Sequence, residues 1–190
     1  MGGLVQHRTL NYRFAEQIFE SHEFQQVKWE IFDIVKRAPD LKLATPKAKT
    51  KGGKERKRVF VTDQGALNKW FKKEFGDREW EVNPYVTDEK VSQLRADYKK
   101  KRVQVEVQFG NMARAIYDVF KMQVSYSQDR IDVGVLIVPM KDFADTIDEN
   151  IAHFERVARE LPYAKMSITL PILVIGIAPK ISPQQAEPVK

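Results

Sequence analysis

The chain contains no cysteine. This absence excludes disulfide bonds, thiolate catalysis and cysteine-ligated zinc, and it is compatible with a cytosolic protein. The three histidines, His7, His22 and His153, are scattered, and none lies at metal-ligand spacing from another ligand. The sequence therefore offers no zinc site.

Long apolar runs are also missing. No stretch reaches the roughly 18 consecutive apolar residues that a transmembrane helix needs. The N-terminal segment, MGGLVQHRTLNYRF, lacks the apolar core of a signal peptide. We expect a cytoplasmic protein with no membrane partner.

The composition is that of a globular protein with a basic excess. Hydrophobic residues make up 43% and charged residues 31% of the 190 residues, enough to bury a core. We expect a single domain over residues 1–190. The formal net charge is +6, and basic residues gather in two clusters, at 46–58 and at 99–102. Such clusters are either solvated or contact nucleic-acid phosphates, and charge alone does not decide between these alternatives.

Apolar residues at three-to-four spacing predict helices in the first half of the chain. One helical region covers residues 12–37, with a break near 21–22. A basic loop follows over about 44–58. A second helix is expected after Thr62 or Asp63, either of which can cap it.

The second half of the chain reads mainly as strands separated by helices. Segments 91–98 and 102–110 flank a run of lysines and predict a hairpin. Continuous apolar runs farther on predict strands that are buried on both faces. The elements expected after the hairpin are a helix over 111–123, a strand over 131–140, a helix over 142–160, a strand over 167–178 interrupted by Pro171, and a frayed tail over about 179–190. This order predicts an α/β fold with a mixed central sheet flanked by helices.

The segment VQVEVQFGN, residues 103–111, alternates between apolar and polar residues. Period-two alternation predicts a half-buried strand, whose polar face carries Gln104, Glu106 and Gln108. In the predicted hairpin, Asp97 of the first strand can come close to Glu106. Two neighbouring carboxylates repel each other, and a divalent cation relieves that repulsion.

Carboxylate oxygens with several retained waters are the ligands that Mg²⁺ selects. Asp97 and Glu106 are therefore candidate metal ligands, and the backbone carbonyl of Val107 is a further oxygen. A cation there would activate a water for attack on a phosphodiester. The alternative is a surface hairpin with incidental carboxylates, which these two residues alone do not exclude.

The motif RADY…VEVQFGN resembles the core of the PD-(D/E)xK nucleases and, more narrowly, restriction endonucleases of the BglII type. That core places an acid on one strand and Glu-x-Lys on the next. The BglII subgroup has Glu-x-Gln instead, which is similar to Glu106-Val107-Gln108 here. The nine-residue separation of Asp97 from Glu106 fits the subgroup too.

This resemblance spans roughly residues 60–178 and implies a restriction-endonuclease-like fold. It makes Asp97 and Glu106 ligands of Mg²⁺, for which Mn²⁺ can substitute, and puts Gln108 in the position usually held by lysine. The upstream segment WEVN resembles a motif of the subgroup that ends in an asparagine near the active site. Asn83 is accordingly implied as a catalytic helper.

The resemblance also implies contacts with double-stranded DNA. Asn111 opens the helix after the catalytic strand, where an asparagine can bind adenine in the major groove or cap the helix, or do both. The loop from Lys141 to Thr146 is the second expected DNA-facing element. Basic residues of the predicted hairpin are candidate phosphate contacts: Lys99, Lys100 and Lys101.

Restriction endonucleases of this type act as symmetric dimers, which read palindromic sites. The resemblance thus implies a homodimer, formed through the helices after Asn111 and Asp142, and a palindrome centred on GATC. It also implies a cognate DNA methyltransferase encoded nearby and a prokaryotic cytoplasm. The enzyme after which this subgroup is named continues with a further C-terminal portion that helps to hold DNA, and we expect segment 46–58 to do part of that work here.

The leading hypothesis is a Mg²⁺-dependent type II restriction endonuclease, a phosphodiester hydrolase that leaves 5′-phosphate ends. The alternative is a DNA-binding protein of the same fold, or a DNA-repair or DNA-processing nuclease without strict sequence specificity. The proton acceptor stays open among Glu106, a second water and a neighbouring DNA phosphate.

Overall fold

The computed structural model describes residues 4–44, 60–88, 92–148 and 150–179 of the chain. The basic loop predicted over about 44–58 and the tail predicted over about 179–190 lie almost wholly outside these residues. None of the described helices combines the length and the apolar character needed to cross a membrane.

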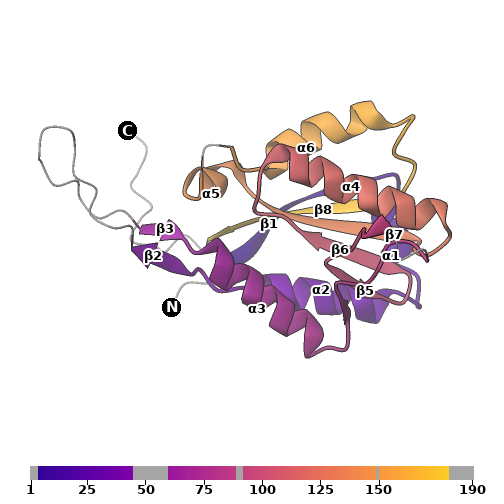
Figure 1. Ribbon diagram of the computed structural model, residues 1–190, viewed down its shortest axis with the longest axis horizontal. Coiled ribbons are helices and arrows are strands. Elements are labelled where there is room, and N and C mark those ends of the chain that lie inside the picture. Colours follow the sequence, from indigo (N-terminus) through magenta and orange to yellow (C-terminus); the bar gives the residue numbers. More distant parts are fainter. Residues whose placement is uncertain (1–3, 45–59, 89–91, 149, 180–190) are drawn as a thin grey trace, which may run out of the picture.

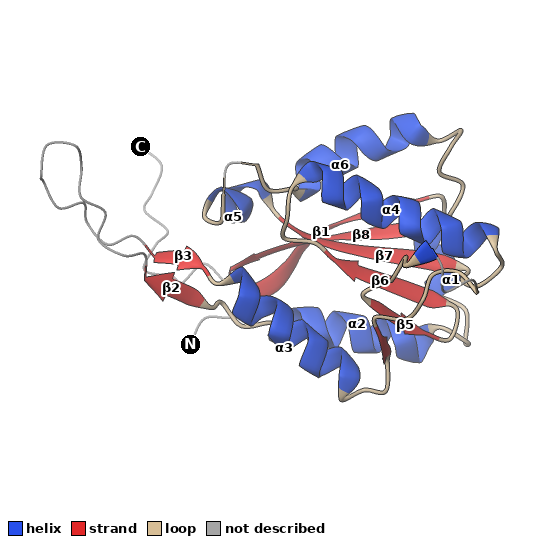
Figure 2. Ribbon diagram, in the orientation of Figure 1, coloured by secondary structure: helices blue, strands red, loops and turns tan. Residues whose placement is uncertain are grey.

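A mixed six-stranded sheet lies at the centre of the described structure, in the order β1-β8-β7-β6-β5-β4 (Figure 2). Its strands are β1 (Leu4–Tyr12), β4 (Glu81–Val82), β5 (Tyr98–Lys100), β6 (Val103–Val107), β7 (Val133–Pro139) and β8 (Ile172–Pro179). The β6–β7 and β7–β8 pairs are parallel, and the other pairs are antiparallel. A separate antiparallel pair joins β2 (Lys42–Ala44) to β3 (Phe60–Thr62). The mixed sheet predicted from the sequence is confirmed.

Helices cover both faces of this sheet (Figure 1). One face packs against α1 (Ala15–Phe19), α2 (Gln25–Arg37) and α3 (Gln64–Gly76). The other packs against α4 (Met112–Ser127) and α6 (Phe154–Glu160), which continues into a 3₁₀ turn over Leu161–Ala164. A short helix, α5 (Lys141–Asp145), follows β7.

The central strand β7 is buried on both faces, as its continuous apolar run predicts. Alternate residues enter different cores: Val135 packs with the α2–α3 side, and Leu136 packs with the α4–α6 side. Gly134 allows α4 to approach closely, because a Cβ at this position would lie 2.5 Å from the sulfur of Met122. The close approach brings other side chains of α4 against β6.

The N-terminal segment forms a strand, β1, that the helical prediction did not include. β1 runs antiparallel to β8, and the first helix begins only at Ala15. Arg13 and Phe14 have φ angles of 53° and 64°, so the chain turns sharply between strand and helix. Pairing with β8 is a contact between the two ends of the chain, which no local pattern carries.

The predicted hairpin is present, but its strands are shorter than the predicted 91–98 and 102–110. The chain is outside the sheet before Asp97: its pairing there is an isolated bridge between Arg95 and Tyr85. At the other end, the last sheet strand begins at Ile172 rather than at 167. Pro171, which precedes it, lacks a backbone N–H for the ladder.

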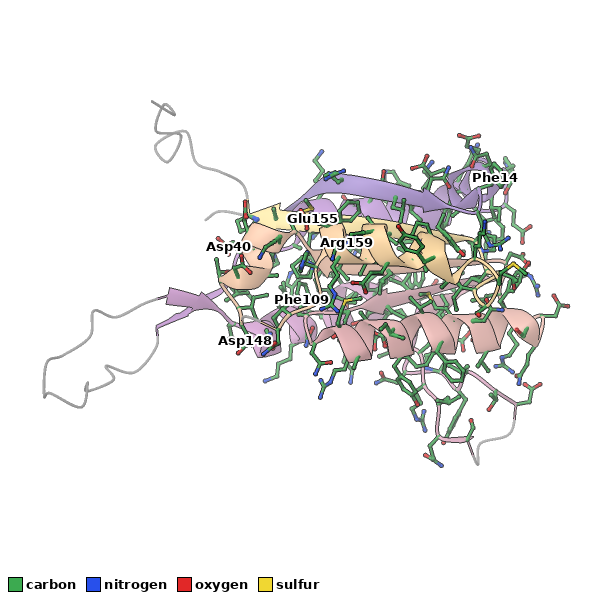
Figure 3. The ribbon with its side chains drawn as sticks, turned by 90° about the horizontal axis from the view of Figure 1, so that it is seen from above. Phe14, Asp40, Phe109, Asp148, Glu155 and Arg159 are labelled. Atoms are coloured by element: carbon green, nitrogen blue, oxygen red, sulfur yellow. The ribbon has the colours of Figure 1, made fainter. Side chains whose placement is uncertain are left out.

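The helix predicted over 142–160 is divided into α5 and α6. Between them, Ile151 forms an isolated bridge with Asn111, and the N–H of Ala152 donates to the carbonyl of Gly110 at 2.8 Å. These bonds tie the segment to the start of α4, so the helix cannot continue through it. Figure 3 shows Phe109 and Asp148 at the same end of the sheet, close to where α4 begins.

Candidate active site

The β5–β6 hairpin brings Asp97 and Glu106 together. Tyr98 pairs with Val105, so the same antiparallel register continued by one residue sets Asp97 opposite Glu106. The N–H of Asp97 lies 3.3 Å from Oε2 of Glu106, and the N–H of Val107 donates to Oδ2 of Asp97 at 2.9 Å. The nine-residue separation in the sequence is thus the separation that this register needs.

Glu106 is completely buried, and the prediction of a half-buried strand is wrong: all five residues of β6 are buried. The polar face of the strand is covered by α4. Both carboxylate oxygens of Glu106 accept hydrogen bonds, Oε1 from Nε2 of Gln104 at 2.7 Å and Oε2 from Nζ of Lys121 at 2.8 Å. The polar residues of β6 therefore face a protein layer instead of solvent.

α4 supplies that layer with three polar side chains, Asp118, Lys121 and Ser125, at the spacing of one helix face. Each contacts one polar side chain, either of β6 or of Gln108, the residue that follows the strand. The contacts run in order along the strand: Ser125 Oγ to Gln104 Oε1 at 2.6 Å, Lys121 to Glu106, and Asp118 Oδ2 to the side-chain amide of Gln108. Lys121 also pairs with Oδ1 of Asp118 at 2.9 Å. We call these six side chains the polar ladder.

The α4 half of the polar ladder was absent from the residues that the sequence suggested. Read as a lone helix, polar positions 118, 121 and 125 are typical of a solvated face. The signal that could have identified them is the apolar character of the neighbouring positions 116 and 120. In the structure, the side chains of Ile116 and Phe120 are 59% and 48% exposed. A helix whose apolar residues face outward must turn a polar face towards something else.

The two carboxyl groups are electrostatically strained. Burial raises the pKa of Asp97, although the hydrogen bond from the N–H of Val107 opposes the shift. Burial, reinforced by the negative charge of Asp97, raises the pKa of Glu106 well above its ordinary value. Burial disfavours the charge of Lys121, but the charges of Glu106 and Asp118 outweigh it and raise the pKa of the ammonium. One ammonium does not offset all the repulsion, so the pair favours a proton or a further cation.

Asn83 and Gln108 also lie beside this pair. The N–H of Asn83 donates to the carbonyl of Asp97 at 2.9 Å, and its φ of 53° is in the left-handed region that asparagine tolerates. The amide of Gln108 is held at both ends, since its Nε2 donates to Asp118 and its Oε1 accepts from the N–H of Gly110 at 2.6 Å. The structure therefore assembles all four predicted catalytic positions around one end of the hairpin.

The DNA-facing positions expected after β6 and β7 gather at the carboxyl ends of these strands. Asn111 caps α4, its side chain accepting from the N–H of Arg114 at 3.1 Å, so the capping alternative is confirmed. Lys141 begins α5 and pairs with Asp145 at 2.9 Å. Thr146 is the C-cap residue that follows α5, and its hydroxyl donates to the carbonyl of Phe143 at 2.7 Å.

The three hairpin lysines lie at the opposite end of β6, because Lys100 pairs with Val103 at the start of that strand. Nζ of Lys100 lies 3.0 Å from both carboxylate oxygens of Glu30. Nζ of Lys101 donates to the carbonyl of Glu23 at 2.8 Å. Lys99 pairs through the backbone with Glu81 and Gln104. The structure does not bring these lysines to the end where Asn111 lies.

The donor set suits a hard divalent cation held by few protein ligands. Within the described ranges, no three His, Asp or Glu side chains are placed to surround one ion. Asp97 and Glu106 lie side by side with raised pKa values, and the carbonyl of Val107 belongs to the next residue. Two carboxylates and a carbonyl, completed by water, fit Mg²⁺, which keeps several waters when bound to proteins.

Comparisons with known proteins agree with this architecture. The family model described as restriction endonuclease BglII/BglIII matches residues 7–177. The crystal structure of restriction endonuclease BglII complexed with a DNA 16-mer is similar, with a TM-score of 0.70 and 15% identity over 89% of this chain and 74% of that chain. The crystal structure of free BglII gives a TM-score of 0.63 and 17% identity over 89% and 77%. No curated protein sequence matches the chain. The restriction-endonuclease-like fold predicted from the sequence is confirmed.

Proposed function

Because the chain belongs to the BglII/BglIII family of restriction endonucleases, which are type II site-specific nucleases, we propose that it hydrolyses double-stranded DNA with the help of Mg²⁺. The proposed site is a palindrome centred on GATC, and the proposed products carry a 5′-phosphate and a 3′-hydroxyl. One observation carries the chemical part of the proposal: Asp97 and Glu106 lie side by side, and both have raised pKa values.

Asp97, Glu106 and the carbonyl of Val107 would hold the cation. When bound, Mg²⁺ or Mn²⁺ lowers the pKa of a water and stabilises negative charge on a phosphodiester. The protein prepares for this by burying Glu106 completely and by fixing both of its oxygens with donors from Gln104 and Lys121. A carboxylate held in this way needs little rearrangement when a cation arrives.

Gln108 acts as an orienting residue in this proposal. Its amide cannot accept a proton from water, and its two ends are held by Asp118 and Gly110. Gln108 would therefore hold the backbone just after β6 in place beside the reacting phosphate, and Asn83 would support Asp97 through its backbone hydrogen bond. The proton of the attacking water must leave to another acceptor, for which Glu106, a second water and the DNA phosphate are the candidates.

Double-stranded DNA would approach the end of the sheet where β6 and β7 finish. Asn111, Lys141 and Thr146 lie there, after strands whose carboxyl ends coincide in a parallel pair. The structure of BglII in complex with DNA supports DNA as the partner. Lys99, Lys100 and Lys101 lie at the far end of the hairpin, so any phosphate they touch would be outside the central base pairs.

The proposed assembly is a homodimer formed through α4 and α6. Ile116, Tyr117 and Phe120 of α4 are 59%, 51% and 48% exposed, and the rings of Tyr117 and Phe120 stack with centroids 6.0 Å apart. Beside them, a cavity of about 340 Å³ opens between α4 and α6. Apolar surface of this kind favours a protein partner. A second copy of the chain would create the two-fold axis that a palindrome requires.

We further propose that residues 1–190 form one nuclease domain and that the protein acts in the cytoplasm of a prokaryote. A restriction enzyme needs a way to spare its own genome. A cognate DNA methyltransferase encoded nearby is therefore part of the proposal, and a reading frame of that kind beside this one would support it.

Digestion of a plasmid by the purified protein with Mg²⁺ tests the proposal. Discrete fragments, which DNA ligase joins without kinase treatment, are the expected result because ligase needs 5′-phosphate ends. A smear would indicate a nuclease without strict specificity. Intact plasmid with any divalent cation, together with sequence-specific gel shifts, would indicate a DNA-binding protein of the same fold.

Substitution of the carboxylates tests the assignment of the site. Asp97→Ala and Glu106→Ala are expected to abolish cleavage while leaving DNA binding in a gel-shift assay. Asp77→Ala is a matched control, because Asp77 is exposed and forms its ion pair with Lys73 of α3, away from the proposed DNA-facing segments. Full cleavage by either site variant contradicts the assignment.

A further inference from the structure

The ammonium of Lys121 lies among three protein oxygens beside the Asp97–Glu106 pair. Its Nζ is 2.8 Å from Oε2 of Glu106, 2.9 Å from Oδ1 of Asp118 and 3.0 Å from the carbonyl oxygen of Arg95. An ammonium has three N–H donors, and these three acceptors use them all. Lys121 thus has no donor left for a water or a phosphate.

These oxygens also resemble the ligands of a hard divalent cation, which takes carboxylate and carbonyl oxygens. They come from three elements: β6, α4 and the segment before β5. Their setting is closed, since the side chains of Glu106, Asp118 and Lys121 are 0%, 8% and 9% exposed. We call this arrangement the oxygen cage.

We propose that Lys121 is a positioning residue whose ammonium fills the oxygen cage and so confines the divalent cation to Asp97 and Glu106. This inference rests on the proposed nuclease function, which it deepens. Glu106 belongs to both places, and its Oε2 is the oxygen that contacts Lys121. A divalent ion that entered the cage would bind this same oxygen, so two cations would share Glu106 and the carboxylate would hold the catalytic one less well.

The polar ladder shows why the ammonium comes from a helix. Gln108 stands where the resembled nuclease core has its lysine, and it contacts Asp118 through its neutral amide. Asp118 in turn contacts Lys121, so the positive charge enters the same network from α4. Ser125, one turn farther along, contacts only the neutral Gln104 in the ladder.

Binding of Mn²⁺ to the DNA-free protein tests the role of Lys121 without any cleavage. Lys121→Met keeps the length of the side chain and removes its charge. This variant is expected to bind one Mn²⁺ per chain more than wild type, counted by the electron paramagnetic resonance signal of free Mn²⁺. In parallel plasmid assays with Mg²⁺ it is expected to cleave about 10- to 100-fold more slowly, the usual loss when a residue behind the metal ligands is changed.

Two further variants separate positioning from simple damage. Ser127→Ala removes a neutral contact with Gln123 on the exposed side of the same helix and is expected to keep the wild-type Mn²⁺ count and cleavage rate. The double variant Asp118→Asn with Lys121→Met removes the ammonium and one carboxylate of the cage. It is expected to bind no additional Mn²⁺ and still to cleave slowly, because the short contact from the ammonium no longer orients Oε2 of Glu106.

A purely structural role would lower Mn²⁺ binding and cleavage together, which overturns the proposal. So does an unchanged Mn²⁺ count in folded Lys121→Met, or wild-type cleavage by the double variant. If Lys121→Met does not melt cooperatively, the double variant is used instead, and its cleavage rate tests the role of Lys121: slow cleavage agrees with the proposal and wild-type cleavage overturns it. If the wild-type protein binds Mn²⁺ but cuts no DNA, the proposed nuclease function is wrong. The Mn²⁺ counts of the variants still test the role of Lys121 in that case.

Discussion

Two lysine–carboxylate pairs lie on opposite faces of the sheet, and they differ in character. Lys100 of β5 meets Glu30 of α2, with Nζ 3.0 Å from both carboxylate oxygens. Lys121 of α4 meets Glu106 of β6 at 2.8 Å. Both carboxylates are buried, and each faces one ammonium across a helix–strand contact.

The neighbours of the two carboxylates make the difference. Burial opposes the charge of Glu30, but hydrogen bonds from Lys100, Trp80 and Gln26 outweigh it and lower the pKa. Around Glu106 the balance is reversed, because burial and the charge of Asp97 raise the pKa despite Lys121. A carboxylate surrounded only by donors holds a fold together, whereas one beside a second carboxylate is suited to bind a cation.

The largest expected difference between the two carboxylates is in the effect of their substitution on DNA cleavage. Glu106→Gln keeps the shape of the side chain and removes the charge that would hold Mg²⁺. The cleavage rate is expected to fall at least about 10³-fold, equivalent to about 4 kcal/mol of barrier. Quenched time courses on plasmid DNA measure the rate. Glu30→Gln is the matched control and is expected to stay within a few-fold of wild type, and equal losses in both variants would remove the distinction.

The next largest effect is on the stability of the fold, and here the substitution of Glu30 is the one expected to matter. Glu30→Ala leaves the ammonium of Lys100 and the indole N–H of Trp80 without their carboxylate, and both contacts are short at 3.0 Å and 2.8 Å. We expect the free energy of unfolding to fall by about 2–3 kcal/mol. Urea denaturation followed by tryptophan fluorescence measures it. A loss below about 0.5 kcal/mol would show that this pair does not hold α2 to the sheet.

Much of the sheet could be predicted from the sequence because its signals are local. The apolar runs that became β7 and β8 need no information beyond themselves, and the alternation in β6 correctly indicated a strand. β1 was missed because its partner is β8, more than 150 residues away in the chain. The division between α5 and α6 was missed because it depends on a bond from Ala152 to Gly110.

The candidate site divides in the same way. Asp97 and Glu106 could be placed together because a hairpin register is set by sequence separation. Lys121 and Asp118 could not, because the angle at which α4 crosses β6 depends on packing such as the contact between Met122 and Gly134. Sequence spacing indicates which residues share a helix face, and it does not say what that face meets.

A smaller effect, the stabilisation of the folded protein by Mg²⁺, also distinguishes Glu106 from Glu30. Mg²⁺ binding to the folded state is expected to stabilise wild type by about 1.4 kcal/mol when its concentration is ten times the dissociation constant. Thermal melts with Mg²⁺ and with EDTA measure the gain. Glu106→Gln is expected to lose it and Glu30→Gln to keep it. An equal gain in all three proteins would indicate that Mg²⁺ binds elsewhere.

The smallest effect is the acid dependence of the Glu30 pair. Its pKa is lowered from the ordinary 4.5, so the unfolded chain takes up this proton at a higher pH than the folded protein does. The stabilisation is therefore complete above about pH 4.5 and is lost as the pH falls through the folded pKa. Urea denaturation of wild type and Glu30→Gln at pH 7 and at successive lower pH values measures the difference between them. That difference is expected to stay constant down to about pH 5 and then to shrink. A difference that grows as the pH falls would mean that the pKa of Glu30 is raised and not lowered. It would also remove the contrast between Glu30, which is held by donors alone, and Glu106, which lies beside a second carboxylate.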